Sequence, residues 1–232
     1  MSARPPILGV DTLRVAPSHR EYEMLAWVGD STVAIGSRTV RIDSVVHAGT
    51  PAWLIVETRT GAVPAAESLY VARSMRPLQW SASLGAARLT VAFGRDSVFG
   101  GTTGPGGRQT IILGGGSSLL VSTAMMEALF PLLDWTPYRS DSVNVLMVDH
   151  VSSTVLAAEL SVIGEDSVAG KPAWIVVLRA PTRSVLFWID RETGTLLRLQ
   201  QPLPLNGASM LEYRLRTHPA ASPSATSPPV GR

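Results

Sequence analysis

The sequence predicts a mainly β protein, in which a curved antiparallel sheet, half-barrel or sandwich is built from two related meanders and carries one short apolar helix. Three observations predict this fold class. The 232 residues include 20 Gly and 17 Pro but only 16% charged residues, which is typical of short strands and turns. One strand-like segment occurs twice, and only one segment has a convincing helical pattern.

The repeated segment is "GTPAWLIVE", which begins at Gly49 and recurs as "GKPAWIVVL" from Gly170. Alternating segments that end in Ala-Gly precede both copies, and this dipeptide indicates a hairpin turn. Further along, the alignment places Arg73 on Arg191. Each copy predicts strand, turn, strand, loop, strand, turn and strand, which is an antiparallel meander. Chance similarity between hydrophobic hairpins is the alternative.

Trp53 and Trp174 lie in strands that are apolar on both faces. A core position is the favoured interpretation for both, because large aromatic side chains dominate cores by area. Stacking on a ligand is the alternative.

The chain is expected to form a single β domain with a segment at each end. The C-terminal segment, rich in Pro, Ser, Ala and Thr, has nothing to bury. The predicted boundaries are 1–17 for an N-terminal extension, 18–216 for the β domain, about 22–85 and 138–205 for the repeat halves, 36–80 and 157–200 for their superposable parts, and 217–232 for a disordered tail.

Two further strand patterns, "ARLTVAFGRDSVFGG" and "RQTIILG", separate the repeat halves. The glycine-rich stretch 100–107 between them suggests a phosphate-binding loop. However, Arg108 leads into a strand and not a helix, so a flexible hairpin loop is the favoured interpretation.

The predicted helix spans 122–135, "STAMMEALFPLLDW". Ser122 or Thr123 can cap it, and Pro131 ends or kinks it. Because the segment is apolar nearly all round, we expect it to be buried or to close an apolar pocket as a lid. The candidate lid and pocket residues are Met125, Met126, Leu129, Phe130, Leu133 and Trp135.

Composition and spacing argue against several function classes. The net charge is +2 with arginines spread along the chain, which does not favour nucleic-acid binding. Without Cys there is no thiolate nucleophile or Cys-ligated zinc, and the four histidines lie far apart. The segment 114–120 lacks the spacing of a serine nucleophile elbow. We therefore predict no catalytic residue, no metal and no cofactor.

Two acidic pairs lie beside predicted turns, Glu165–Asp166 and Asp190–Glu192. Acidic side chains at turns usually face water, so we expect solvated turn residues and not an acid–base pair.

The chain start lacks a signal-peptide pattern, and no apolar window is long enough to span a bilayer. We therefore expect a soluble protein with no membrane span. If a leader has been removed, the location is the periplasm or cell envelope; if the chain is complete, it is the cytoplasm.

The order of "AMMEALFPLLDW", "NVLMVD", "VIGEDSVAGKPAWIVVLR" and "FWIDRETGTLLRLQQPLP" resembles the exported bacterial proteins of domain-of-unknown-function family 3108, over about 18–215. The resemblance implies a curved antiparallel sheet with little helix, located in the envelope of a Gram-negative-type bacterium. It also implies a shape similar to the open half-barrels of periplasmic lipoprotein carriers. It carries over no catalytic residue.

Two hypotheses of function follow. A non-catalytic envelope protein would bind or carry an apolar ligand such as a lipid in the concavity of the sheet. An envelope scaffold or protein-interaction module would instead have a dry core and bind an envelope protein through its edges. A hydrolase is less favoured than either.

Overall fold

The computed structural model describes residues 15–114, 119–137, 140–148, 153–181, 183–205 and 208–216. The expected N-terminal extension 1–17 lies almost wholly outside this part of the chain, and the expected tail 217–232 lies wholly outside it. The described strands form one continuous sheet in the order β8-β7-β6-β5-β4-β3-β2-β1-β15-β14-β13-β12-β11-β10-β9. All neighbours are antiparallel except β9, which is parallel to β10. The predicted mainly β class is confirmed.

Each half of the sheet is a run of hairpins. The first half comprises β1 (Ser18–Val28), β2 (Ser31–His47), β3 (Thr50–Gly61), β4 (Ala65–Ala72), β5 (Pro77–Leu84), β6 (Ala87–Phe93), β7 (Ser97–Gly104) and β8 (Gly107–Gly114). The second comprises β9 (Leu119–Leu120), β10 (Ser140–Val148), β11 (Ser153–Val168), β12 (Lys171–Ala180), β13 (Arg183–Asp190), β14 (Leu196–Leu205) and β15 (Ala208–Leu215). The halves join where β1 pairs with β15.

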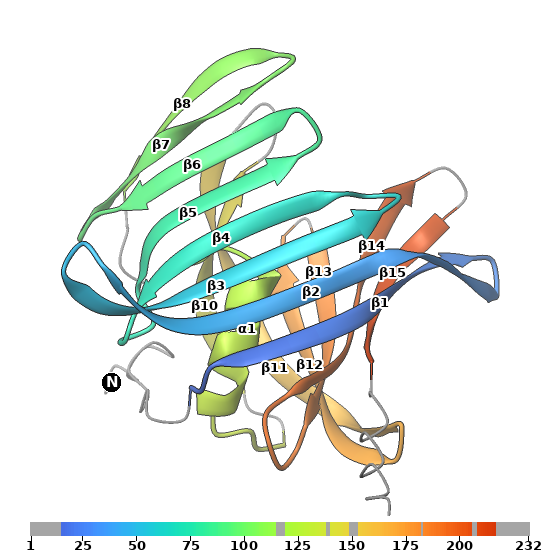
Figure 1. Cartoon of the computed structure of the whole chain (residues 1–232). Coiled ribbons are helices and arrows are strands. Elements are labelled where there is room, and N and C mark those ends of the chain that lie inside the picture. The colour runs from blue at the N-terminus through green and yellow to red at the C-terminus, as the bar shows by residue number, and fades with distance from the viewer. Residues whose placement is uncertain are drawn as a thin grey trace, which may run out of the picture.

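The sheet curls around the helix α1 (Thr123–Leu129) and the single 3-10 turn η3 (Phe130–Leu132) that follows it. Figure 1 shows α1 inside the curve, between β1–β3 of the first half and β10–β13 of the second. Near the two edges of the sheet, β8 approaches β11. The inward side chains of both halves and those of the helix therefore share one hydrophobic core.

The repeat is visible in the turns. The β2–β3 hairpin turns at Ala48 (φ 47°) and Gly49 (φ 79°), and the β11–β12 hairpin turns at Ala169 (φ 50°) and Gly170 (φ 78°). Two successive residues with positive φ are characteristic of the tight turns that match the twist of a hairpin. The Ala-Gly dipeptides thus form equivalent turns in the two halves.

The aligned side chains also make equivalent contacts. The Arg73 guanidinium lies 3.7 Å from the centroid of the Trp53 ring, and that of Arg191 lies 4.2 Å from the Trp174 ring. The pairing of β4 with β5 and that of β13 with β14 both contain a register shift just before these arginines. Both tryptophans are buried, as expected of core residues, and each is covered by an arginine through a cation–π contact.

The helix is shorter than the predicted span 122–135. Its beginning agrees with the prediction, because the Ser122 hydroxyl accepts a hydrogen bond from the Met125 N–H at 3.3 Å. Its end does not: α1 stops at Leu129, and the backbone becomes extended at Leu133. Pro131 accounts for this end, since it has no N–H to continue the helical hydrogen bonds and its ring would clash with the preceding turn.

The glycine-rich stretch 100–107 is not a flexible loop, which corrects the expectation. Gly100 and Gly101 lie within β7, and the turn to β8 consists of residues 105–106 alone. A Cβ at Gly100 would lie 2.1 Å from the carbonyl oxygen of Thr90 on β6. Glycine is required there because the neighbouring backbone is too close for a side chain.

Candidate ligand-binding site

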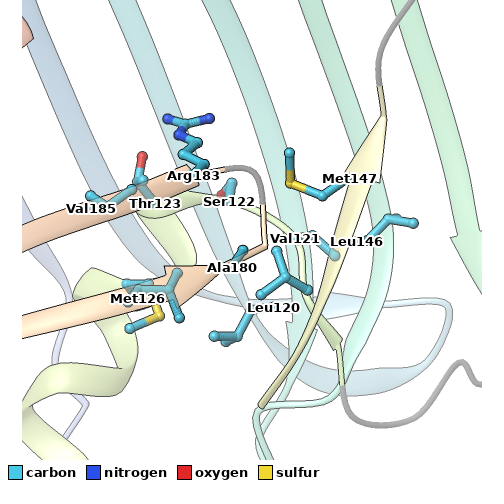
Figure 2. A pocket seen from close by; sticks show the side chains of 12 residues that line it. Leu120, Val121, Ser122, Thr123, Met126, Leu146, Met147, Ala180, Arg183 and Val185 are labelled. Atoms are coloured by element: carbon cyan, nitrogen blue, oxygen red, sulfur yellow. The ribbon is translucent and has the colours of Figure 1, made fainter. Parts of the chain in front are cut away.

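A pocket of about 100 Å³ lies beside the beginning of α1 (Figure 2). Its walls come from residues 120–123, from α1 and from strands β10, β12 and β13. Nine of the twelve lining residues are apolar, and the other three are Ser122, Thr123 and Arg183. The pocket therefore suits a small apolar group and has one cation in its wall.

Of the six residues predicted to form a lid and pocket, Met126 lines this pocket. The side chains of the other five pack into the hydrophobic core of the protein around α1 and η3. Phe130 packs edge-on against Phe187 of β13, with ring centroids 5.1 Å apart, and its carbonyl oxygen accepts a hydrogen bond from Trp135 Nε1 at 2.9 Å. Buried without lining the pocket are Met125, Leu129, Phe130 and Leu133, while Trp135 is partly buried.

Arg183 was missed by the sequence analysis. It is the first residue of β13, and four residues earlier Arg179 lies near the end of β12. The structure separates the two residues: Arg179 lies 4.0 Å from the carboxylate of Glu159, whereas Arg183 lines the pocket. No sequence signal distinguishes these two arginines, because the difference depends on the curl of the sheet.

The Arg183 guanidinium donates a hydrogen bond to the side-chain oxygen of Gln201. Among the described residues no carboxylate pairs with it. Partial burial lowers its pKa, an effect that the nearby Tyr213 opposes. The residue as a whole is exposed, so solvent screening limits that shift and the guanidinium remains charged at neutral pH.

A buried ionic cluster anchors α1 on the opposite side. Arg38 of β2 is fully buried and donates to Glu57 of β3 through Nε at 2.9 Å and Nη2 at 2.7 Å. Through Nη1 it also donates to Glu127 of α1 at 2.5 Å. The hydroxyl of Tyr22 on β1 donates to the other oxygen of Glu127 at 2.7 Å. The helix is therefore held directly to β1 and β2 by charge-assisted hydrogen bonds, and Arg38 links it in turn to β3.

The pKa directions agree with this arrangement. Burial alone would lower the pKa of Arg38, but the charges of Glu127 and Glu57 outweigh burial and raise it well above its usual value. Burial, followed by the charge of Glu127, raises the pKa of Tyr22 well above its usual value. Arg38 is therefore always charged, and Tyr22 is always a neutral donor to Glu127.

Glu67 of β4 lies directly opposite Glu57 in the sheet. Burial and then the charge of Glu57 raise the pKa of Glu67 from 4.5 to about 7. Although the residue as a whole is partly exposed, its Oε1 is buried without a partner at hydrogen-bond distance, and Oε2 accepts a long bond of 3.4 Å from Trp80 Nε1. The side chain of Ser122 lowers the pKa of Glu67, but by less than burial raises it. The poor solvation of this carboxylate explains why it binds a proton near neutral pH.

The predicted turn acids differ in environment. Glu165 and Asp166 are exposed, as expected. Asp190 is buried, which corrects the expectation of a solvated side chain: its Oδ1 accepts hydrogen bonds from the backbone N–H groups of Glu192 and Thr193, at 2.9 and 3.1 Å. Its role is to hold the β13–β14 turn.

The two described histidines do not form a site together. His19 is exposed on β1, and the ring of His47 at the end of β2 stacks on Tyr70, with centroids 4.1 Å apart. Within the described ranges, no group of three or more His, Asp or Glu side chains could hold a metal ion. The remaining candidates of this kind, His150, His218, Ser117 and Ser118, lie outside the described residues.

No protein-family model and no curated protein matches the chain, so membership of family 3108 stays a prediction. Among solved structures, the β-barrel-like protein of domain-of-unknown-function family 1849 from Brucella abortus is similar, with a TM-score of 0.56 and 12% identity over 88% of this chain and 97% of that chain. The structure of MucB gives a TM-score of 0.28 and 13% identity over 94% of this chain and 58% of that chain. The first similarity supports the fold alone, and the second is too low to support an argument.

No helix among the described residues has the length and apolar character needed to cross a bilayer.

Proposed function

We propose that the chain is a non-catalytic cell-envelope protein that binds an apolar ligand, such as part of a lipid, inside its curved sheet. The observation that carries the proposal is the apolar pocket beside the beginning of α1. An apolar cavity with few polar groups favours the binding of an apolar group over chemistry on a polar substrate. The envelope location rests on the resemblance to family 3108.

The packing of α1 supports a binding role more than the movement of a lid. Glu127 fixes one side of the helix to Arg38, while Met126, next to it in sequence, faces the pocket. Met126 and Met147 are flexible, polarizable side chains that can rearrange around ligands of different shape. We infer that the ligand contacts the pocket while the helix stays in place.

Replacing Phe130 by a charged residue is not an informative test of this proposal. Phe130 is fully buried against Phe187, so a charge there would unfold the protein whether or not a ligand binds. The test belongs in the pocket wall, where Ala180 of β12 lies at the edge of the cavity.

The experiment compares Ala180→Phe with Ala66→Phe, a matched change at an exposed strand position of β4. Native mass spectrometry of the freshly purified protein and displacement of a fluorescent apolar probe measure occupancy. We expect the Ala180→Phe variant to lose co-purifying ligand and probe binding, and the Ala66→Phe variant to keep both. Equal binding by the two variants, or a wild-type protein that binds neither probe nor lipid, would contradict the proposal.

A scaffold function is the second candidate, and one surface feature favours it. Phe99 of β7 and Ile112 of the edge strand β8 are paired across the sheet, and they are 51% and 72% exposed. An exposed apolar pair on an edge strand is a place where a partner's strand could add to the sheet. An envelope protein captured by the wild-type chain and lost with Ile112→Lys, while probe binding is unchanged, would favour this candidate.

A further inference from the structure

The pocket wall contains a cation, Arg183, that no carboxylate in the described part of the chain neutralises. Elsewhere in the described chain, most arginines lie within 4.0 Å of a carboxylate: Arg20, Arg38, Arg41, Arg59, Arg179, Arg191, Arg198 and Arg214. Among the residues that the structure describes, the hydrogen-bond partner of Arg183 is the neutral amide of Gln201. Its charge, next to an apolar cavity, is therefore available to a ligand.

The hydrogen bond to Gln201 leaves most of the guanidinium free. The group carries five N–H donors in a planar fork, and the bond to Gln201 uses one of them at Nη2. Gln201 can hold the fork in position without cancelling its charge. A carboxylate or phosphate oxygen pair matches the free edge of such a fork, and it forms bonds about twice as strong as neutral ones.

The volume of the pocket limits the apolar part of the ligand. An apolar cavity of about 150 Å³ holds the six carbons of a benzene ring, so on the same scale about 100 Å³ holds a chain of roughly four carbons. Met126 and Met147 in the wall can move to admit a somewhat longer chain. The pocket suits a short alkyl chain, or the end segment of a longer one.

We infer that the pocket binds a single-chain anionic amphiphile, with its carboxylate or phosphate head on Arg183 and its alkyl chain between β10, β12, β13 and α1. This inference rests on the proposed function, to which it adds the charge of the ligand and the residue that selects it. The cation at the pocket wall favours anionic over neutral or cationic amphiphiles of the same length.

The experiment titrates the full chain with four ligands that each contain six carbons: hexanoate, hexyl phosphate, hexanol and hexylammonium. Isothermal titration calorimetry gives the affinities. The wild-type protein should bind hexanoate or hexyl phosphate at least 10-fold more tightly than hexanol, and hexylammonium most weakly. Comparing the first two distinguishes a fatty-acid head from a phosphate head, and either result supports the inference.

Three variants test the role of the arginine. Arg183→Gln should weaken binding of the anionic ligands roughly 10-fold or more and leave hexanol unchanged, since a hydrogen bond to a charged group is lost. Arg183→Lys should restore part of that affinity. The matched control is Arg179→Gln, which removes an exposed arginine from the neighbouring strand. It should change neither the affinity for the anionic ligands nor the affinity for hexanol.

The outcomes separate the two proposals. If hexanol binds the wild-type protein as tightly as hexanoate, or if Arg183→Gln leaves the hexanoate affinity within twofold, the inference is wrong and the apolar pocket still stands. If none of the four ligands binds the wild-type protein, both proposals fail. Thermal melting of each variant confirms that a loss of affinity does not come from unfolding.

Discussion

The buried pair between Arg38 and Glu127 should contribute strongly to stability, and its removal gives a sharp test of how α1 is held. Replacing Glu127 by Met deletes a carboxylate that is 2.5 Å from Arg38 Nη1 and 2.7 Å from the Tyr22 hydroxyl. Breaking a buried ion pair from one side costs about 3 to 5 kcal/mol. We expect the lower end, about 3 kcal/mol, because Arg38 keeps its two bonds to Glu57.

The reverse change should cost more. Arg38→Met removes the closest cation from two buried carboxylates, which leaves Glu57 with Arg59 Nε at 3.1 Å and Glu127 with Arg20 Nη1 at the longer distance of 3.6 Å. We expect a loss of about 5 kcal/mol, the upper end of the range. In the double variant neither Arg38 nor Glu127 is left as an unpaired buried charge, and Glu57 keeps Arg59. Its loss should therefore be smaller than the sum of the two single losses by about 2 kcal/mol.

Urea denaturation of the wild type, both single variants and the double variant measures this cycle. A 3 kcal/mol loss should also lower the melting temperature by roughly 6 to 12 °C in a chain of this size. The control is the exposed pair Arg179 and Glu159, for which the same cycle should give a coupling below about 0.5 kcal/mol. Additive losses at Arg38 and Glu127, or a coupling no larger than the control's, would refute the role assigned to the cluster.

Three further predictions follow from single residues. The folded state binds the Glu67 proton more tightly than the unfolded state does, because the pKa of Glu67 is raised from 4.5 to about 7 on folding. This stabilisation is fully present below pH 4.5 and is lost as the pH rises through about 7. In unfolding titrations between pH 5 and 8, Glu67→Gln should therefore remove the part of the fall in stability that Glu67 causes, up to about 3 kcal/mol. Gly194→Ala should destabilise the protein by about 1 to 3 kcal/mol more than Gly49→Ala in urea, because both have positive φ but only a Cβ at Gly194 would meet Pro131, at 2.6 Å from its Cα; equal losses would contradict the contact. Trp174→Ala should cost about 3 to 5 kcal/mol by the same assay, since the residue is only 7% exposed; a near-neutral result would place its ring outside the core.

The two Ala-Gly hairpin turns could be predicted because their signals are local. The Ala-Gly turn at 48–49 and its copy at 169–170 specify hairpins whatever the rest of the chain does. The continuity of the sheet could not be predicted in the same way. It depends on the pairing of β1 with β15 at opposite ends of the chain, and a sandwich of two separate meanders would have the same local pattern.

The buried cluster was missed, although the sequence carries a signal for it. Arg38 has the same parity as Val40 and Ile42 along β2, and Glu57 has the same parity as Trp53 and Ile55 along β3. Residues two apart in a strand share a face, so both charges lie on the inward face. Charged residues usually face water, and this general rule argues against placing Arg38 and Glu57 on the inward face. The pairing of Arg38 with Glu127 of α1 becomes visible only in the folded structure.

The position of the pocket follows from the position of the cluster. If α1 rotated to fill the pocket with its own side chains, Glu127 would leave Arg38 and Tyr22, and buried charges would be left without partners. If the helix lost its first turn instead, the Ser122 cap on Met125 would be broken. Both movements that would close the pocket are therefore opposed by specific polar contacts. A cavity lined by apolar side chains persists because the charged side of the helix fixes how that helix can pack.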